Sequence, residues 1–116
     1  MLSIERFKTL AIEAEARLSQ LAIANAAVVF ADGLAIAPGT GPFDRVIVQG
    51  VLADVPESLI GAIGDQGVLV AARPDPAGKR RQQIVRMTRK GGGGLEAVPV
   101  CPCRLQALLA GEAAAL

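Results

Sequence analysis

The chain has 116 residues, of which 52% are hydrophobic, with three Phe and no Tyr or Trp. This length suits one small domain, so we expect a single domain over residues 1–116 with a core of aliphatic side chains. The formal charge of +1 gives no overall attraction to nucleic acid or acidic membranes, and the absence of His excludes Ser–His hydrolases, zinc hydrolases and most metal sites.

The N-terminus and the cysteines both bear on where the protein works. No apolar run reaches the length of a membrane span, and Glu5, Arg6 and Lys8 lie where a signal peptide needs its apolar stretch. Cys101 and Cys103 form one Cys-Pro-Cys pair rather than a disulfide framework, which is typical of a reducing compartment. We therefore expect a cytoplasmic protein with no membrane partner.

The first half of the chain alternates strand-like and helix-like patterns. Residues 1–4 are expected to be the end of a strand, and apolar residues at three- and four-residue steps then predict a helix over about 7–22. Residues 26–31 (AAVVFA) are predicted to be a short buried strand, which Asp32-Gly33 ends. The Pro and Gly residues of 38–42 indicate a loop.

The same alternation continues with two strands and a short helix. Residues 45–49 (RVIVQ) and 67–72 (GVLVAA) have the composition of buried parallel strands, and Pro56 opens a short helix between them. Because both runs are apolar on both faces, we expect their central side chains in the core. These side chains are Val46, Ile47, Val48, Leu69 and Val70.

The C-terminal third has the pattern of a hairpin. Residues 82–89 alternate in polarity, the four glycines at 91–94 indicate a turn, and 95–103 is predicted to return as the second strand. Residues 105–115 are expected to form either a short Ala/Leu helix or a frayed tail. Strands that alternate with helices indicate an α/β fold, here with a mixed sheet and a C-terminal β-hairpin.

Two acidic positions follow predicted strands. Glu5 lies just before the first helix, where nucleotide-binding α/β folds hold ribose hydroxyls, because a carboxylate accepts both hydroxyl protons. Asp32-Gly33 follows the next strand, where Asp can accept an adenine amino proton and Gly lets the backbone approach. The alternatives are a solvated first-turn Glu that favours the helix dipole and an ordinary strand-ending turn.

An ordered series of short motifs runs along most of the chain. The motifs are S-I-E-R at 3–6, F-A-D-G at 30–33, P-F-D-R-V-I-V at 42–48, V-P-E-S-L at 55–59, Q-G-V-L-V at 66–70 and Q-Q-I-V-R-M-T-R at 82–89. Each motif is short, but their order, with gap-free spacing from Ser3 to about Ala72, resembles the protein-L-isoaspartate O-methyltransferase family.

The resemblance implies a Rossmann-like fold, S-adenosylmethionine as cofactor and methyl transfer to L-isoaspartyl carboxylates of damaged proteins. It also implies that Glu5 binds the donor's ribose and that Asp32 and Gly33 lie beside its adenine. Such an enzyme mainly positions the carboxylate against the sulfonium methyl group, so the lack of His is compatible with the reaction. The expected partner is a protein or peptide that carries isoaspartyl residues.

The sequence also departs from the family pattern. The family's first strand, its G-x-G-x-G loop and its N-terminal substrate segment would precede Ser3. Gln49 replaces a Thr or Gly beside the substrate, and Gln66 replaces the first Gly of a Gly-Gly turn. The resemblance therefore assigns no catalytic residue in this chain, and we expect the isolated chain to be inactive.

In the family's sheet the first strand lies between the strand that ends at Glu5 and the strand at 45–49. We therefore expect an N-terminally truncated methyltransferase domain with two half-sheets, whose exposed edges favour pairing with a partner or a second copy. The alternative function is a non-catalytic remnant or interaction module that binds a partner along such an edge.

Two other groups of residues have a structural and a functional interpretation. Half of the basic residues lie at positions 79–90, but without interleaved aromatics a solvated hairpin is favoured over a nucleic-acid surface, so we expect no nucleic-acid partner. Cys101 and Cys103 are interpreted as ordinary strand cysteines, with a soft-metal site as the alternative, because zinc sites require two such pairs or His.

Overall fold

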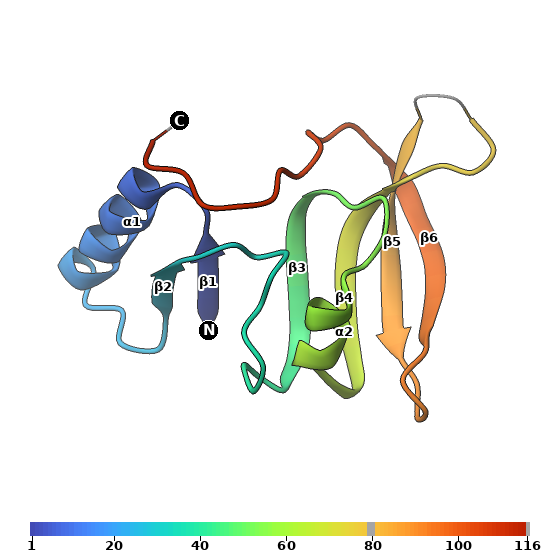
Figure 1. Cartoon of the computed structure of the whole chain (residues 1–116), viewed down its shortest axis with the longest axis horizontal. Helices are drawn as coiled ribbons and strands as arrows, with labels where there is room; N and C mark the ends of the chain where they lie inside the picture. The colour runs from blue at the N-terminus through green and yellow to red at the C-terminus, as the bar shows by residue number, and fades with distance from the viewer. Residues whose placement is uncertain (79–80, 116) are drawn as a thin grey trace. The chain divides into compact units, whose positions relative to one another are not determined.

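The computed structural model describes residues 1–78 and 81–115, which fall into two compact units. The first unit comprises Met1–Ile36 and Ala110–Leu116, of which 110–115 are described, and the second comprises Ala37–Leu109. Along the chain the elements follow the predicted order of strand, helix, strand, strand, helix and three further strands (Figure 1).

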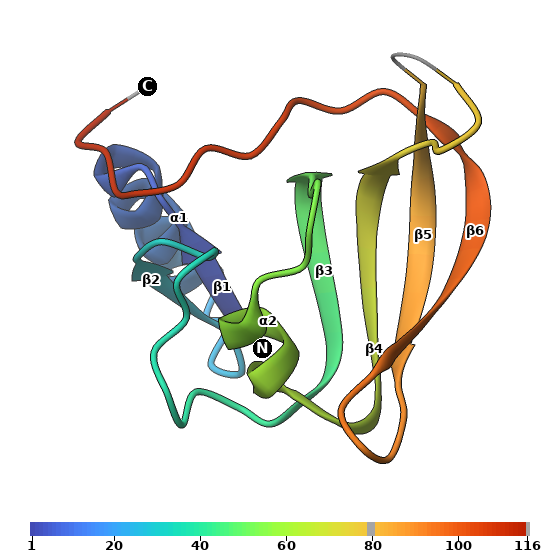
Figure 2. The same ribbon diagram turned by 45° about the vertical axis from the view of Figure 1, so that its right-hand side comes forward.

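The first unit is a two-stranded parallel sheet with one helix. Strand β1 (Leu2–Glu5) pairs with β2 (Ala27–Phe30), and Glu5 is the partner of Phe30 in this register. Helix α1 (Lys8–Gln20) lies beside both strands in Figures 1 and 2. The predicted strands and helix are therefore confirmed, with ends shifted by one or two residues.

The first unit buries little apolar surface of its own. Ala11 is the only hydrophobic residue that is buried among the described residues of this unit, and Val29 on β2 is 44% exposed. β1 and β2 each have a single hydrogen-bonded neighbour, so each leaves one edge unpaired. A two-stranded sheet of this kind is marginally stable alone, because it has too few side chains to cover its faces.

The second unit is a four-stranded mixed sheet with the order β3-β4-β5-β6. β3 (Phe43–Val51) and β4 (Ile63–Pro74) are parallel and are joined through α2 (Glu57–Ala62). β5 (Gln82–Arg89) and β6 (Leu95–Cys103) complete the sheet in antiparallel fashion, and Figures 1 and 2 show the four strands side by side. The predicted C-terminal hairpin is thus confirmed.

The core of this unit is built mainly on β4 and β5. Leu69 of β4 and Met87 of β5 are register partners, and both are almost completely buried. The buried hydrophobic residues of the second unit are Leu52, Leu59, Ala62, Ile63, Val68, Leu69, Ala71, Ala72, Val85 and Met87. Because β4 is an interior strand with a neighbour on each side, it contributes more of them than any other element.

The predicted core is correct for Leu69 and wrong for Ile47. Leu69 has no exposed surface, whereas Ile47 is 75% exposed, and Val46, Val48 and Val70 are half-buried. β3 is an edge strand of the four-stranded sheet. In the register, Val46 pairs with the buried Leu69 and Ile47 pairs with the half-buried Val70, so Ile47 lies on the less covered face of the sheet. An apolar run shows that a strand can be covered on both faces, but the elements packed on each face decide whether it is covered.

Residues 105–115 are irregular, with isolated β-bridges at Ala107 and Ala113, so the predicted Ala/Leu helix is wrong. The Val51 amide donates to the Gln106 carbonyl at 2.9 Å, and the Leu108 amide donates to the Val51 carbonyl at 3.4 Å. Gly50 makes room for this approach, because a Cβ atom there would lie 2.4 Å from Cδ2 of Leu108. These tertiary contacts override the helix propensity of Ala and Leu, which is a weak preference.

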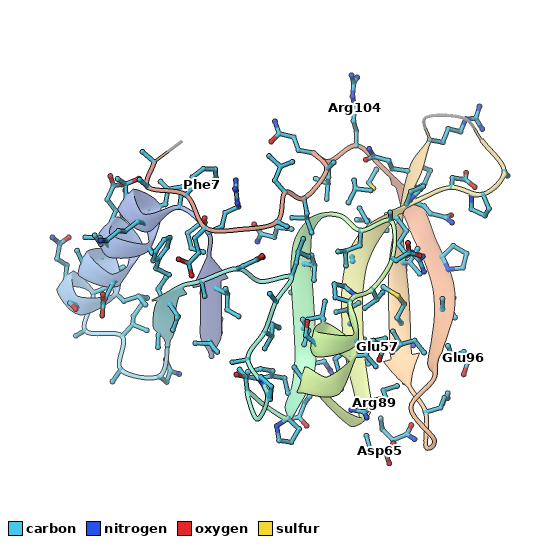
Figure 3. The ribbon with its side chains drawn as sticks, in the orientation of Figure 1. Phe7, Glu57, Asp65, Arg89, Glu96 and Arg104 are labelled. Carbon is cyan, nitrogen blue, oxygen red and sulfur yellow. The ribbon has the colours of Figure 1, made fainter. Side chains whose placement is uncertain are left out.

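The described part of the basic cluster makes local structural contacts. The Arg89 guanidinium donates to the carbonyls of Ile60 and Ile63 at the end of α2, and Figure 3 shows Arg89 below this helix. Lys90 forms an ion pair with Glu96 at 3.0 Å. Lys79 and Arg80 lie outside the described residues. Within 1–78 and 81–115, no helix is both long and apolar enough to cross a bilayer.

Candidate functional site

The three residues predicted to contact a nucleoside lie at one edge of the first unit. Glu5 is the last residue of β1, and Asp32-Gly33 begins two residues after the end of β2. Since these strands are parallel and Glu5 is in register with Phe30, their carboxyl ends meet at the same edge of the sheet. This is the edge at which open α/β sheets bind their ligands.

The Glu5 carboxylate is half-buried and has one oxygen engaged. Its Oε1 accepts a hydrogen bond from the Phe7 amide at 2.8 Å, which fixes the side chain at the turn between β1 and α1. Its Oε2 has no hydrogen-bond partner among the described residues. The carboxylate is therefore oriented by the backbone and still has an oxygen with which to accept a ligand hydroxyl.

Both oxygens of Asp32 accept hydrogen bonds from backbone amides. Oδ1 accepts from Leu34 at 2.8 Å, which closes the turn after β2, and Oδ2 accepts from Gly111 at 2.7 Å. Each carboxylate oxygen has a second lone pair, so these bonds leave acceptor capacity for a ligand amino group. The bond to Leu34 is the strand-ending turn that the sequence offered as the alternative, whereas the bond to Gly111 is a structural role that no local pattern indicated.

Gly33 is not required by the packing of the first unit. A Cβ atom at this position would lie 3.8 Å from Cγ2 of Ile4, which is ordinary van der Waals contact. The space beside the Gly33 backbone is therefore available to a side chain or to a ligand.

The C-terminal segment 110–115 is hydrogen-bonded to the same edge of the first unit. The Lys8 and Thr9 amides, in the first turn of α1, donate to the carbonyls of Ala113 at 2.9 Å and Ala114 at 3.2 Å. First-turn amides have no partner within their own helix, so this segment acts as the cap that the side chain of Phe7 does not supply. We call residues 110–115 the C-terminal strap.

Arg6 holds the strap from the strand side. Its Nε donates to the Gly111 carbonyl at 2.9 Å, and its guanidinium lies 4.7 Å from the ring centroid of Phe7, a residue labelled in Figure 3. Sequence reasoning did not assign roles to Arg6 and Gly111. Their separation in the chain leaves no local pattern, although Gly111 has a φ of 86°, which favours glycine.

The two departures from the family pattern lie in the second unit. Gln49 is exposed on β3. Gln66 has a φ of 58°, a left-handed conformation that glycine adopts without the Cβ clash of other residues. This backbone geometry gives a physical reason for the Gly that the family pattern has at the position of Gln66.

We expect Asp32→Ala to loosen the strap at Gly111, while Arg6 and the first-turn amides of α1 still hold it. The substitution removes both acceptors, and hydrogen bonds to charged groups contribute about 1.5–3 kcal/mol each. The Gly111 amide should then exchange its hydrogen at least about tenfold faster, since about 1.4 kcal/mol corresponds to a factor of ten. Amide exchange measured by NMR on both proteins checks this expectation. Asp44→Ala, which removes an exposed carboxylate, is the control, and unchanged exchange at Gly111 in the Asp32 variant would contradict the assigned role.

A comparison with protein families matches nearly the whole chain. Residues 1–112 match the model of the protein-L-isoaspartate(D-aspartate) O-methyltransferase family. Among the described residues there is no group of three or more Cys, Asp or Glu side chains that could hold a metal ion.

Curated relatives carry the name of the same family. Protein-L-isoaspartate O-methyltransferase 2 of Rhodopseudomonas palustris strain HaA2 is 43% identical over 95 residues, which cover 82% of this chain and 43% of the relative. The protein-L-isoaspartate O-methyltransferase of Caulobacter sp. strain K31 is 39% identical over 112 residues, which cover 96% of this chain and 50% of the relative. The chain thus spans about half the length of these relatives.

A solved structure shares the fold. A crystal structure from Plasmodium falciparum, named for protein-L-isoaspartate O-methyltransferase and containing S-adenosyl-L-homocysteine, superimposes with a TM-score of 0.76 at 18% identity. The match covers 93% of this chain and 51% of that one. The α/β, Rossmann-like methyltransferase fold predicted from the sequence is therefore confirmed, and the chain belongs to the protein-L-isoaspartate(D-aspartate) O-methyltransferase family.

Proposed function

We propose that this chain is part of an S-adenosylmethionine-dependent methyltransferase that acts on L-isoaspartyl carboxylates of damaged proteins. The observation that carries the proposal is the shared carboxyl edge of the parallel strands β1 and β2, where Glu5 ends β1 and Asp32-Gly33 follows the end of β2. Family membership supports the reaction, and the S-adenosyl-L-homocysteine in the Plasmodium falciparum structure supports the cofactor class.

The residues at this edge fit the nucleoside part of such a donor. Glu5 would accept the ribose hydroxyl protons through Oε2, and Asp32 would accept an adenine amino proton while Gly33 leaves its backbone accessible. The donor, when bound, supplies an electrophilic methyl group on its sulfonium. These residues hold and orient it, and orientation alone can provide much of the catalysis of a methyl transfer.

The proposal requires a further strand and a glycine-rich loop. β1 and β3 each have one neighbouring strand, and among the described residues the outer edge of β3 is hydrogen-bonded only at Val51, to the segment around Ala107. The first unit buries only Ala11 among its described apolar residues. A segment that paired with these edges would satisfy their backbone N–H and C=O groups. Its loop would supply backbone amides for the donor's carboxylate.

The test compares the chain alone with the chain extended by a family N-terminal segment. Calorimetric titration should detect no S-adenosylmethionine binding to the chain alone and clear binding to the extended protein. In the extended protein, Glu5→Gln keeps the shape of the side chain but removes its charge. Donor affinity should then fall about 10- to 100-fold, because charge-assisted hydrogen bonds contribute about 1.5–3 kcal/mol.

The matched control is Glu13→Gln on the exposed face of α1. Glu13 forms a surface ion pair with Arg17 at 3.0 Å, and such pairs contribute little to stability. This variant should retain donor affinity, and both variants should melt close to the parent protein. If the Glu5 variant and its parent bound the donor equally well, Glu5 would not bind the ribose. If the chain alone bound the donor with micromolar affinity, donor binding would not need a glycine-rich loop.

A second function from another class is an interaction module that binds a partner strand. The exposure of Ile47 on the edge strand β3 favours it, because an open apolar edge is a template for strand addition. Sedimentation of the chain alone and of the extended protein discriminates the two functions. A module should self-associate or bind a strand peptide and gain no donor affinity on extension, whereas the methyltransferase should become monomeric and bind donor.

A further inference from the structure

Cys101 and Cys103 line one groove at the free edge of the four-stranded sheet. The groove is also lined by Asp75 and Arg81 of the loop after β4, by Gln82 and Gln83 at the start of β5, and by Arg104. Cys101 is exposed, Cys103 is half-buried, and both are free thiols. Figures 1 and 2 both show the loop after β4 beside the end of β6. All of these residues belong to the second unit.

The register places the two thiols on the same side of β6. Cys101 pairs with Ile84 and Cys103 pairs with Gln82, with no register shift between them. Since successive side chains in a strand alternate between faces, positions two apart point in the same direction. The two sulfur atoms are therefore available to one ligand.

The surrounding contacts restrain the backbone around the two cysteines. The Gln82 side chain accepts from the Leu105 amide at 2.7 Å and donates to the Leu105 carbonyl at 3.1 Å, which holds the chain just beyond Cys103. Pro102 restricts the backbone between the two cysteines, and an edge strand tolerates it. A preorganised pair of ligands loses less conformational entropy when it binds.

The same geometry disfavours a disulfide. Strand residues two apart have Cα atoms separated by about 6.6 Å, at the far end of the range of about 4.4–6.8 Å that disulfides span. A disulfide would therefore have to form near the limit of this range, away from the usual separation of about 5.5–6 Å. Two unbridged thiols that face one groove provide the sulfur donors that a thiophilic ion prefers.

We propose that Cys101 and Cys103 bind a soft monovalent metal ion, with Cu(I) as the matching cation. Soft thiolates select Cu(I), whereas structural zinc sites require four ligands and close with further Cys or His. The chain has no His, and among the described residues no third Cys, Asp or Glu completes such a cluster. The Asp75 carboxylate in the groove already accepts from the Ala77 amide at 2.9 Å.

The charge of the groove agrees with this choice. Binding releases both thiol protons, so that two thiols and one Cu(I) give a bis-thiolate complex of charge −1 and two protons. Arg81 and Arg104 line the groove and would offset that charge. Arg104 extends away from the sheet in Figure 3, so its contribution is that of a screened charge rather than of a direct contact.

The experiment titrates the reduced full chain with Cu(I) without oxygen, in competition with a chromogenic Cu(I) chelator. We expect one Cu(I) per chain, no change in sedimentation when Cu(I) is added, and an ultraviolet thiolate-to-copper band. Cys101→Ser and Cys103→Ser should each lower Cu(I) affinity by at least about 100-fold, because the second thiolate acts at the high effective concentration of an intramolecular ligand. Ag(I), which is redox-inert, should behave in the same way, and Zn(II) should bind at least about 100-fold more weakly than Cu(I).

Each alternative outcome would overturn the inference. Half a Cu(I) per chain with dimer formation would show that the thiols bridge two chains. Cys101 is the exposed cysteine, so Cys101→Ser is the variant least able to disturb folding. Unchanged Cu(I) affinity in this variant would show that the two cysteines do not chelate the ion together. Equal affinity for Zn(II) would show that the site is not selective for soft monovalent ions. Circular dichroism of the variants confirms that they are folded.

Discussion

Leu69→Ala is expected to lower the free energy of unfolding by about 2–5 kcal/mol, the range for removing a buried Leu side chain. Leu69 has no exposed surface, lies on the interior strand β4 and is the register partner of the buried Met87. Its truncation would leave a cavity that the sheet cannot easily close, because β4 is hydrogen-bonded to β3 on one side and to β5 on the other. Urea unfolding followed by circular dichroism measures the loss.

Ile47→Ala provides the matched control for this prediction. Ile47 is an aliphatic residue on the neighbouring strand β3, but 75% of its surface is exposed. Its truncation should change the free energy of unfolding by no more than about 0.5 kcal/mol, as for most surface substitutions. A larger loss for Ile47→Ala than for Leu69→Ala would mean that the chain in solution buries the outer face of β3.

Gly67→Ala is expected to destabilise the protein by about 1–3 kcal/mol through overpacking. A Cβ atom at Gly67 would lie 2.6 Å from Cγ2 of Ile63, 2.7 Å from the Gly64 carbonyl oxygen and 3.0 Å from the Phe43 carbonyl oxygen. Two of these three atoms belong to the backbone, so relief of the clash requires β3 and the start of β4 to move apart. Thermal and urea unfolding should both report the loss.

Gly61→Ala should instead raise the free energy of unfolding. Gly61 lies in α2, and a Cβ atom there would meet nothing within 4 Å. Because Ala is the better helix former, this change should stabilise the protein by up to about 1 kcal/mol. The same Gly-to-Ala change thus reports close backbone approach at Gly67 and helix propensity at Gly61. If both were neutral, the packing described around Gly67 would not exist in solution.

The sequence by itself determined the order of elements and the ends of most strands. Residues 82–89 alternate in polarity, and the structure buries Val85 and Met87 on one face of β5. The positions of Glu5 and Asp32 at the ends of two strands were also readable, because both signals are local. Side-chain periodicity and turn residues act over a few positions, and a local pattern therefore records them.

Only the tertiary structure decided which apolar strand is covered and how the chain's end is used. Ile47 and Leu69 lie in similar apolar runs, yet one belongs to an edge strand and the other to an interior strand. Asp32 accepts from Gly111, which is 79 positions away, and Ala113 and Ala114 cap α1 from the opposite end of the chain. Strand order and long-range hydrogen bonds depend on which distant segments meet. No local periodicity encodes that choice, because it is made by the free energy of the whole fold.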